Sequence, residues 1–153
     1  MRKLTIDATP ENLAIVFKFM QDAFSEYEIP KKQMRQIKLC VEEIYINIAN
    51  YAYTPSTGKA GIAFDFWGAV GGTAPLSVKI SFEDSGKPYN PLEKEDPDIE
   101  LDLDDTPIGG LGIFIVKETM DNVWYERRGG HNIFIMEKEL IPVSEREPEK
   151  AVS

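Results

Sequence analysis

Two stretches of the chain alternate large apolar residues with small or polar ones, at a period of two residues. Residues 62–66 carry Ile, Phe and Phe at alternate positions, and residues 76–82 carry Leu, Val, Ile and Phe in the same way. Successive side chains of a strand point to opposite faces of its sheet. The alternation therefore predicts strands with one buried and one solvated face, which is typical of an antiparallel sheet covered on one side only.

Apolar residues at helical spacing predict the layer that covers this sheet. Thr9 and Pro10 form a helix start, with Thr9 as N-cap, and the apolar spacing then continues to about Tyr27. A second helix is predicted from about residue 30 to residue 53, and a third from residue 112 to residue 122. These segments give the sheet enough helix to cover one face.

Three further strands are predicted near residues 4–6, 123–127 and 132–138. The last two are joined by Arg128-Gly129-Gly130-His131, whose glycines supply the positive φ that a tight hairpin needs. We expect an α/β two-layer sandwich, with a mixed, mostly antiparallel sheet and helices on one face. The chain has 153 residues, 42% of them hydrophobic, which is enough for one core, so residues 1–140 should form a single domain.

An acidic tract interrupts the predicted elements. Residues 93–105 contain eight acidic residues and one base, Lys94, and prolines stand at positions 91, 97 and 107. Such a segment buries too little apolar surface to offset the entropy of ordering it. Long loops in compact domains are often functional lids, so we expect a lid at about residues 92–108, poorly ordered without a ligand. Residues 141–153 are expected to be a disordered C-terminal tail.

Charge and composition exclude several classes of protein. The net charge of −9 disfavours binding to nucleic acid or to anionic lipid. The single cysteine, Cys40, excludes an intramolecular disulfide and a cysteine-rich zinc site. No stretch approaches the ~20 apolar residues of a membrane span. A soluble, cytoplasmic protein is expected.

The second predicted helix carries a polar stripe. Glu43, Asn47 and Asn50 follow one another at i, i+4 and i+7, beside the apolar stripe. A solvated helix face is the simpler interpretation of such a stripe. The helix already has a separate charged face, however, formed by Lys31, Lys32, Arg35 and Lys38. A stripe that faces a cleft beside the core is therefore the alternative that we prefer.

Two glycine-containing turns follow strand or loop segments. Asp84-Ser85-Gly86 follows the strand predicted at residues 76–82, a pattern that most often marks an ordinary turn. Gly109-Gly110-Leu111-Gly112 opens the third helix, where backbone N–H groups and the helix dipole can receive phosphate oxygens. It is neither a P-loop nor a dinucleotide fingerprint, because the Lys-Ser/Thr ending and the third glycine of those motifs are missing.

Taken together, these motifs resemble the GHKL ATP-binding superfamily, and within it the small serine/threonine kinases that act as bacterial anti-sigma factors. The resemblance lies in residues 41–53 (VEEIYINIANYAY), residues 84–91 (DSGKPYNP), and residues 109–116 (GGLGIFIV) with Met120-Asp121. It spans roughly residues 3–140. It implies the GHKL ATPase fold, ATP as the nucleotide and Mg²⁺ as the metal.

The resemblance also implies roles for individual residues. Glu43 matches the general base, and Asn47 matches the side chain that helps to hold Mg²⁺ between the phosphates. Both project from one helical face, as in-line transfer requires. Asp84 matches the carboxylate that binds the adenine amino group, and Gly86 the residue whose missing side chain lets the base approach. The other residues implied in nucleotide binding are Asn50, Gly109, Gly110, Leu111 and Gly112.

Two positions depart from the family pattern. Tyr51 stands where kinases of the family often carry a histidine. The segment from residue 95 to residue 108 has no Lys or Arg to stabilise charge on a transferring phosphoryl group. Lys87 and Lys94 are the possible substitutes.

The function that the resemblance implies is that of a serine/threonine protein kinase, which phosphorylates a STAS-domain anti-anti-sigma partner and holds a sigma factor in the alternative complex. One alternative is an ATP-dependent partner-binding module with little or no phosphoryl transfer. Another is slow ATP hydrolysis without a protein substrate. Family members often dimerise, so a homodimer is expected.

Overall fold

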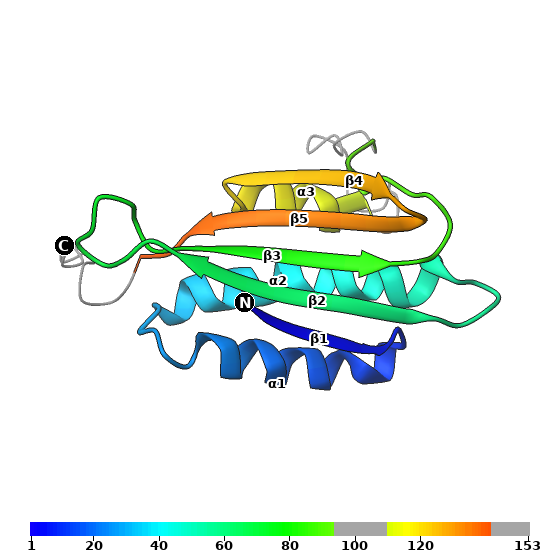
Figure 1. The fold of residues 1–153 in the computed structure, drawn as a ribbon, viewed down its shortest axis with the longest axis horizontal. Coiled ribbons are helices and arrows are strands. Elements are labelled where there is room, and N and C mark those ends of the chain that lie inside the picture. The colour runs from blue at the N-terminus through cyan, green and yellow to red at the C-terminus, as the bar shows by residue number, and fades with distance from the viewer. Residues whose placement is uncertain (94–109, 142–153) are drawn as a thin grey trace, which may run out of the picture.

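The structure, a computed structural model, describes residues 1–93 and 110–141. Its centre is a five-stranded sheet with the order β1-β2-β3-β5-β4 (Figure 1). The strands are β1 (Arg2–Asp7), β2 (Lys59–Trp67), β3 (Ser77–Asp84), β4 (Asn122–Arg128) and β5 (His131–Glu139). Every neighbouring pair is antiparallel.

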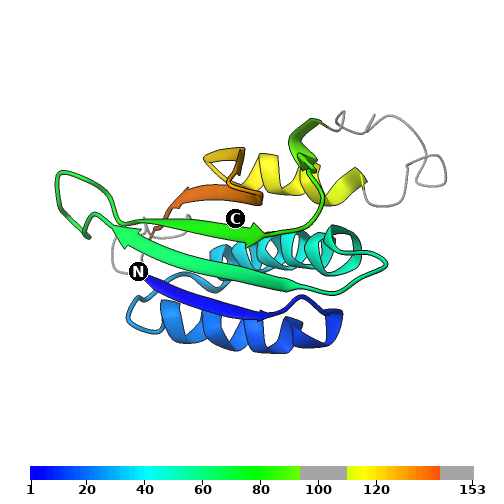
Figure 2. The same cartoon turned by 45° about the vertical axis from the view of Figure 1, so that its right-hand side comes forward.

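The helices lie on one side of this sheet, with α2 and α3 across its face and α1 along β1 and β2 (Figure 2). They are α1 (Leu13–Phe24), α2 (Lys31–Asn47) and α3 (Gly110–Thr119). In the described residues they are accompanied by three short helical turns: η1 (Pro10–Asn12), the π-helical η2 (Ile48–Ala52) and η3 (Pro91–Glu93).

The predicted two-layer α/β fold is confirmed, with one difference in the sheet. A mixed sheet was expected, but all four strand pairings among the described residues are antiparallel. Two hairpins, β2–β3 and β4–β5, account for two of these pairings. The connection from β3 to β4 includes α3 and leaves one strand position free beside β3. β5 fills this position, pairs with β3 in the antiparallel sense, and leaves β4 as the edge strand.

The core lies between the sheet and the helices. The alternation that predicted β2 and β3 is confirmed, because Ile62, Phe64 and Ile80 are fully buried on the helix side. Ile37 and Val41 of α2 cover them and are also fully buried. Burial of such side chains stabilises a fold by roughly 1.5–3 kcal/mol each, so this two-layer contact supplies much of the driving force for folding.

Helix ends differ from the sequence prediction in four places, one of them the third helix, which spans Gly110–Thr119 rather than residues 112–122. Thr9 has extended backbone geometry at the cap but makes no side-chain capping bond, and the first helix ends at Phe24 rather than Tyr27. The Ser25 hydroxyl donates to the carbonyl of Asp22 at 2.7 Å, which satisfies a helix-end acceptor. The second helix changes to π-helical geometry at Ile48. The Gly129-Gly130 turn is confirmed, with φ of 58° and 82°.

Most of the predicted lid and tail lies outside the described residues. Of residues 92–108 the structure describes Leu92 and Glu93, and of residues 141–153 only Ile141. In the parts that it does describe, no helix has both the length and the apolar character needed to cross a membrane.

Candidate functional site

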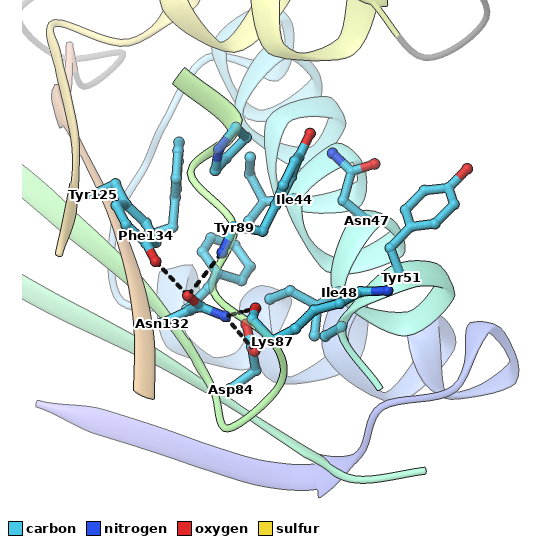
Figure 3. A pocket seen from close by; sticks show the side chains of 13 residues that line it. Ile44, Asn47, Ile48, Tyr51, Asp84, Lys87, Tyr89, Tyr125, Asn132 and Phe134 are labelled. Carbon is cyan, nitrogen blue, oxygen red and sulfur yellow. Dashed lines mark hydrogen bonds between the residues drawn. The ribbon is translucent and has the colours of Figure 1, made fainter. Parts of the chain in front are cut away.

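A pocket of about 370 Å³ opens where the end of α2 and η2 faces the ends of β3, β4 and β5 (Figure 3). Its wall is mostly apolar, with a few polar groups. The lining residues are Ile44, Asn47, Ile48, Tyr51, Ala52, Phe82, Asp84, Lys87, Tyr89, Pro91, Tyr125, Asn132 and Phe134. Mostly apolar walls with a few fixed polar groups are typical of small-molecule sites.

Asp84, the last residue of β3, presents a carboxylate to this pocket. The residue is only 6% exposed. Its Oδ1 accepts hydrogen bonds from the Gly86 backbone N–H and from Asn132 Nδ2, both at 2.9 Å. Oδ2 accepts no hydrogen bond from the described residues, and among those residues no fully buried side-chain polar atom lacks a partner. Asp84 Oδ2 is therefore an open acceptor in an otherwise ordered site.

Asn132 fixes the orientation of Asp84, and sequence reasoning missed it. Its Nδ2 also donates to the Lys87 carbonyl at 2.8 Å, while its Oδ1 accepts from the Tyr125 hydroxyl and from the Tyr89 backbone N–H (Figure 3). An asparagine with two donated and two accepted bonds is fully satisfied. Asn132 lies directly across from Asp84 in the β3–β5 pairing, so only the register would have revealed it.

The turn after Asp84 is clamped against the end of η2. A Cβ at Gly86 would lie 2.2 Å from the Ala52 carbonyl oxygen, and that oxygen accepts the Lys87 backbone N–H at 3.1 Å. Arg127 Nη1 donates to the Gly86 carbonyl at 2.9 Å. The structure gives Gly86 a packing role against Ala52, and the approach of a base that the resemblance implies stays a prediction.

Asn47 and Asn50 separate in the structure. Asn47 lines the pocket from the last turn of α2, as predicted for a residue of the polar stripe. Asn50 is exposed and is not among the pocket-lining residues, while its carbonyl accepts the Thr54 hydroxyl at 2.6 Å. The reason is the π-helical geometry from Ile48 on, in which i→i+5 hydrogen bonds widen the turn and break the 3.6-residue spacing.

Glu43 lies one turn before Asn47 and is half-buried between α2 and α3. A Cβ at Gly112, in the first turn of α3, would lie 2.0 Å from Glu43 Oε2. Burial raises the pKa of the Glu43 carboxyl above its usual range, with a smaller contribution from the charge of Glu42. The missing side chain of Gly112 thus makes room for the Glu43 carboxylate, and the contact of its backbone with phosphates stays a prediction.

The remaining glycine-motif residues are only partly described. Gly110 begins α3, and Leu111 after it is 41% exposed. Gly109 lies outside the described residues. In the described part of the chain, no group of three or more His, Cys, Asp and Glu side chains forms a metal site.

Two other reactive side chains lie apart from the pocket. Cys40 is fully buried in α2, and burial raises the pKa of its thiol to about 11, so it packs as an apolar side chain, as predicted. His131 Nδ1 lies 2.9 Å from the Ser85 hydroxyl and 3.4 Å from Glu83 Oε1, on the exposed end of the β4–β5 hairpin. Neither residue lines the pocket.

Comparison with known proteins gives three agreeing results. Residues 6–138 match the family described as histidine kinase-like ATPase domain. The serine/threonine-protein kinase BtrW of Bordetella bronchiseptica is 28% identical over 108 residues, which cover 71% of this chain and 72% of BtrW. The crystal structure of the RsbU and RsbW domains of Rv1364c from Mycobacterium tuberculosis is similar in fold, with a TM-score of 0.56 and 14% identity. That match covers 92% of this chain but only 33% of the other.

Since the family match extends over most of the sequence, the chain belongs to the histidine kinase-like ATPase domains of the GHKL superfamily.

Proposed function

We propose that this chain is an ATP-dependent serine/threonine protein kinase of the anti-sigma factor type. In this proposal it acts in the cytoplasm, phosphorylates a STAS-like anti-anti-sigma partner, and sequesters a sigma factor in the alternative complex. The observation that carries the proposal is the open carboxylate oxygen of Asp84, which shares one pocket with Asn47. Asn47 in turn lies one helical turn after Glu43 on α2. The kinase BtrW, a relative over most of this chain, supports the reaction class.

In this proposal the pocket holds the adenine base. Ile44, Ile48 and Phe82 supply apolar surface for the base, and Asp84 Oδ2 would accept a hydrogen bond from its amino group. The oxygen is held by the two bonds to Oδ1, so little ordering is needed when the nucleotide binds. A guanine base would present a carbonyl oxygen at that point, and two facing acceptors repel each other. This geometry favours ATP over GTP.

Glu43 is the residue that we assign as general base. Its raised pKa makes the carboxylate a stronger base, which helps it to accept a proton from a serine or threonine hydroxyl. As the hydroxyl oxygen bonds to the γ-phosphorus, its proton passes to Glu43, and the bond to the bridging oxygen breaks to leave ADP. Asn47, whose amide oxygen suits a hard cation, is the residue that would hold Mg²⁺, and the metal would offset the charge of the phosphates.

One observation favours a second candidate, an ATP-dependent partner-binding module with little transfer. The sequence from residue 95 to residue 108 carries no Lys or Arg, and Lys87 is the one cation among the described residues that line the pocket. Fewer cations around the transferring group give less stabilisation of its charge. Slow ATP hydrolysis would use the same site with water in place of the hydroxyl, and a homodimer is the expected assembly.

Incubation with γ-labelled ATP and the co-encoded STAS-like protein tests the proposal. We expect label on a serine or threonine of the partner, and a loss of about 10²- to 10⁴-fold in Glu43→Gln with little change in ATP affinity. A base must be deprotonated, and its pKa is raised, so transfer by the parent should fall on acidification at a higher pH than for an ordinary glutamate. Glu43→Gln should lack this pH dependence.

Three other outcomes would contradict the proposal. No label on the partner, with partner binding that still requires ATP, would establish the binding module. Label only as inorganic phosphate would establish hydrolysis. An equal loss of ATP affinity in Glu43→Gln and Asn47→Ala would show that Glu43 has a structural role.

A further inference from the structure

The first three turns of α2 concentrate positive charge in an acidic chain. The net charge of the protein is −9, yet the first acid of this helix is Glu42. Four exposed cations precede it, and we call them the α2 basic cluster: Lys31, Lys32, Arg35 and Lys38. None of the four forms an ion pair with a carboxylate of the described residues.

This placement of charge destabilises the helix. The N-terminal end of a helix is its positive end, where cations are unfavourable and acids are favourable. Lys31 and Arg35 are also spaced i, i+4, so their like charges repel each other. Pro30 at the N-cap offers no side-chain hydrogen bond to the free N–H groups. The start of α2 thus carries cations where acids would stabilise the helix, and no ion pair with the described residues offsets them. Such an unfavourable local arrangement indicates a functional surface.

Apolar surface lies directly beside the α2 basic cluster. A groove of about 480 Å³ between α1 and α2 is lined by Phe17, Met20 and Met34, with Lys18, Arg35 and Lys38 among its polar residues. Lys38 Nζ lies 4.5 Å from the centre of the Phe17 ring, so the cation covers the aromatic face. On the other side of Arg35, a second hollow includes Ile29 and Ile141.

This surface is separate from the nucleotide pocket. The α2 basic cluster begins at Lys31, whereas Asn47 ends the same helix. At 1.5 Å per residue the two ends lie roughly 24 Å apart, and Figure 1 shows the helix running behind the sheet between them. Lys38, the nearest member of the cluster, is still roughly 14 Å from Asn47 along the helix, and none of the four cations lines the pocket.

We propose that the α2 basic cluster and the adjoining α1–α2 groove form the docking site for an acidic, amphipathic segment of a partner protein. A segment with acidic side chains on one face and apolar side chains on the other would pair with the cations and bury the Phe17 and Met34 surface. This proposal stands independently of the kinase assignment, because it uses no residue of the nucleotide pocket.

The net negative charge of this protein favours a short protein segment over larger anionic ligands at the α2 basic cluster. Salt screens charge over about 8–10 Å, so a short segment is attracted by the local cluster. A nucleic acid duplex or an anionic membrane extends over a much larger area and meets the acidic remainder of the surface. The apolar groove also has no counterpart in a phosphate backbone.

A charge-reversal experiment on the whole chain tests the docking site. The probe is a fluorescein-labelled helical peptide with glutamates along one face and leucines along the other. The test variant reverses three cations of the cluster: Lys31→Glu, Lys32→Glu and Arg35→Glu. The control variant reverses three exposed cations elsewhere, each of which has a carboxylate partner: Lys3→Glu, Lys59→Glu and Arg128→Glu.

Both variants change the net charge equally. We nevertheless expect only the test variant to lose peptide affinity, and we expect the two melting temperatures to shift in opposite directions. The test variant should bind the peptide at least ~10-fold more weakly, while its melting temperature rises because acids replace cations at the positive end of the helix dipole. The control variant should keep the affinity, and its melting temperature should fall as three ion pairs are lost. Binding by the parent should weaken as salt is raised.

Several results would overturn the proposal. Equal peptide affinity in the test and control variants would remove the cluster as a binding site. Equal binding of a sequence-scrambled peptide would exclude the apolar groove. Tighter binding of duplex DNA, of phosphatidylserine vesicles, or of a peptide with the sequence of residues 93–105 would assign the surface to another occupant. If the triple variant does not fold, the peptide affinity of Arg35→Gln and the salt dependence of peptide binding by the parent test the same proposal.

Discussion

In the proposed function the two carboxylate oxygens of Asp84 have separate tasks: Oδ1 orders the turn, and Oδ2 accepts from the adenine amino group. Asp84→Asn separates these tasks. The amide oxygen can take the place of Oδ1 and accept from the Gly86 N–H and from Asn132 Nδ2, as the carboxylate does at 2.9 Å. The amide NH₂ group then replaces Oδ2 at the pocket. A donor would face the adenine amino group, which is also a donor. The substitution therefore keeps the fold and removes the acceptor for the base.

The expected loss of ATP affinity follows from this exchange of an acceptor for a donor. Loss of one hydrogen bond to a charged acceptor, with a buried donor left unsatisfied, costs about 1–3 kcal/mol. That corresponds to roughly a 5- to 150-fold loss of ATP affinity. GTP carries an acceptor at the same position of the base, so its affinity should hold or rise. Titration calorimetry of ATP and GTP with the parent and the variant measures both changes.

Asp84→Ala provides the matched comparison. It leaves the Gly86 N–H and Asn132 Nδ2 without their shared acceptor, so the free energy of unfolding should fall by about 1–3 kcal/mol for each. Asp84→Asn should not show this loss in chemical denaturation. Unchanged ATP affinity in Asp84→Asn, or an equal loss for ATP and GTP, would refute the assignment of Oδ2 to the adenine amino group.

Three further substitutions test the rest of the site. Asn47→Ala removes the proposed metal ligand, so ATP affinity should drop in the presence of Mg²⁺ and change little in EDTA, as calorimetry in both buffers would show. Gly86→Ala forces the backbone away from the Ala52 carbonyl at 2.2 Å and should lower the free energy of unfolding by about 1–3 kcal/mol in urea denaturation. Gly112→Ala meets only the flexible end of Glu43, so stability should hold while the carboxylate moves toward solvent. The Glu43 pKa then falls, and the acidic limit of phosphoryl transfer in a pH profile should move to lower pH. A destabilised Gly112→Ala or an unaffected Gly86→Ala would contradict this pairing of contacts.

Much of the fold could be predicted because its signals are local. The period of two in residues 62–66 and 76–82 identifies a one-sided sheet, and Gly129-Gly130 identifies a hairpin through its positive φ. Cys40 could also be placed, because a small side chain between apolar neighbours of a helix packs inward. Each of these predictions depends on a residue and its near neighbours in sequence.

The features that sequence reasoning missed depend on contacts between distant segments. Asn132 supports Asp84 only because β3 and β5 pair in one register, and a shift of one residue would turn its side chain to the other face. The change to π-helical geometry at Ile48 moves Asn50 out of the stripe, and a count at 3.6 residues a turn does not reveal it. The packing reasons for Gly86 and Gly112 require the positions of Ala52 and Glu43, which are remote in sequence.

The contact between Glu43 and Gly112 links the proposed base to the first turn of α3. Burial is the main cause of the raised Glu43 pKa, and the first turn of α3 provides part of that burial. The proton affinity of the base therefore depends on where α3 lies. The N–H groups in the first turn of a helix attract anions, and the Glu43 carboxylate lies beside this turn at Gly112. In the proposed function, a phosphate that approached the turn would repel the charge of Glu43. The proposal therefore couples nucleotide binding to the position of the base, and a side chain at position 112 should displace the Glu43 carboxylate.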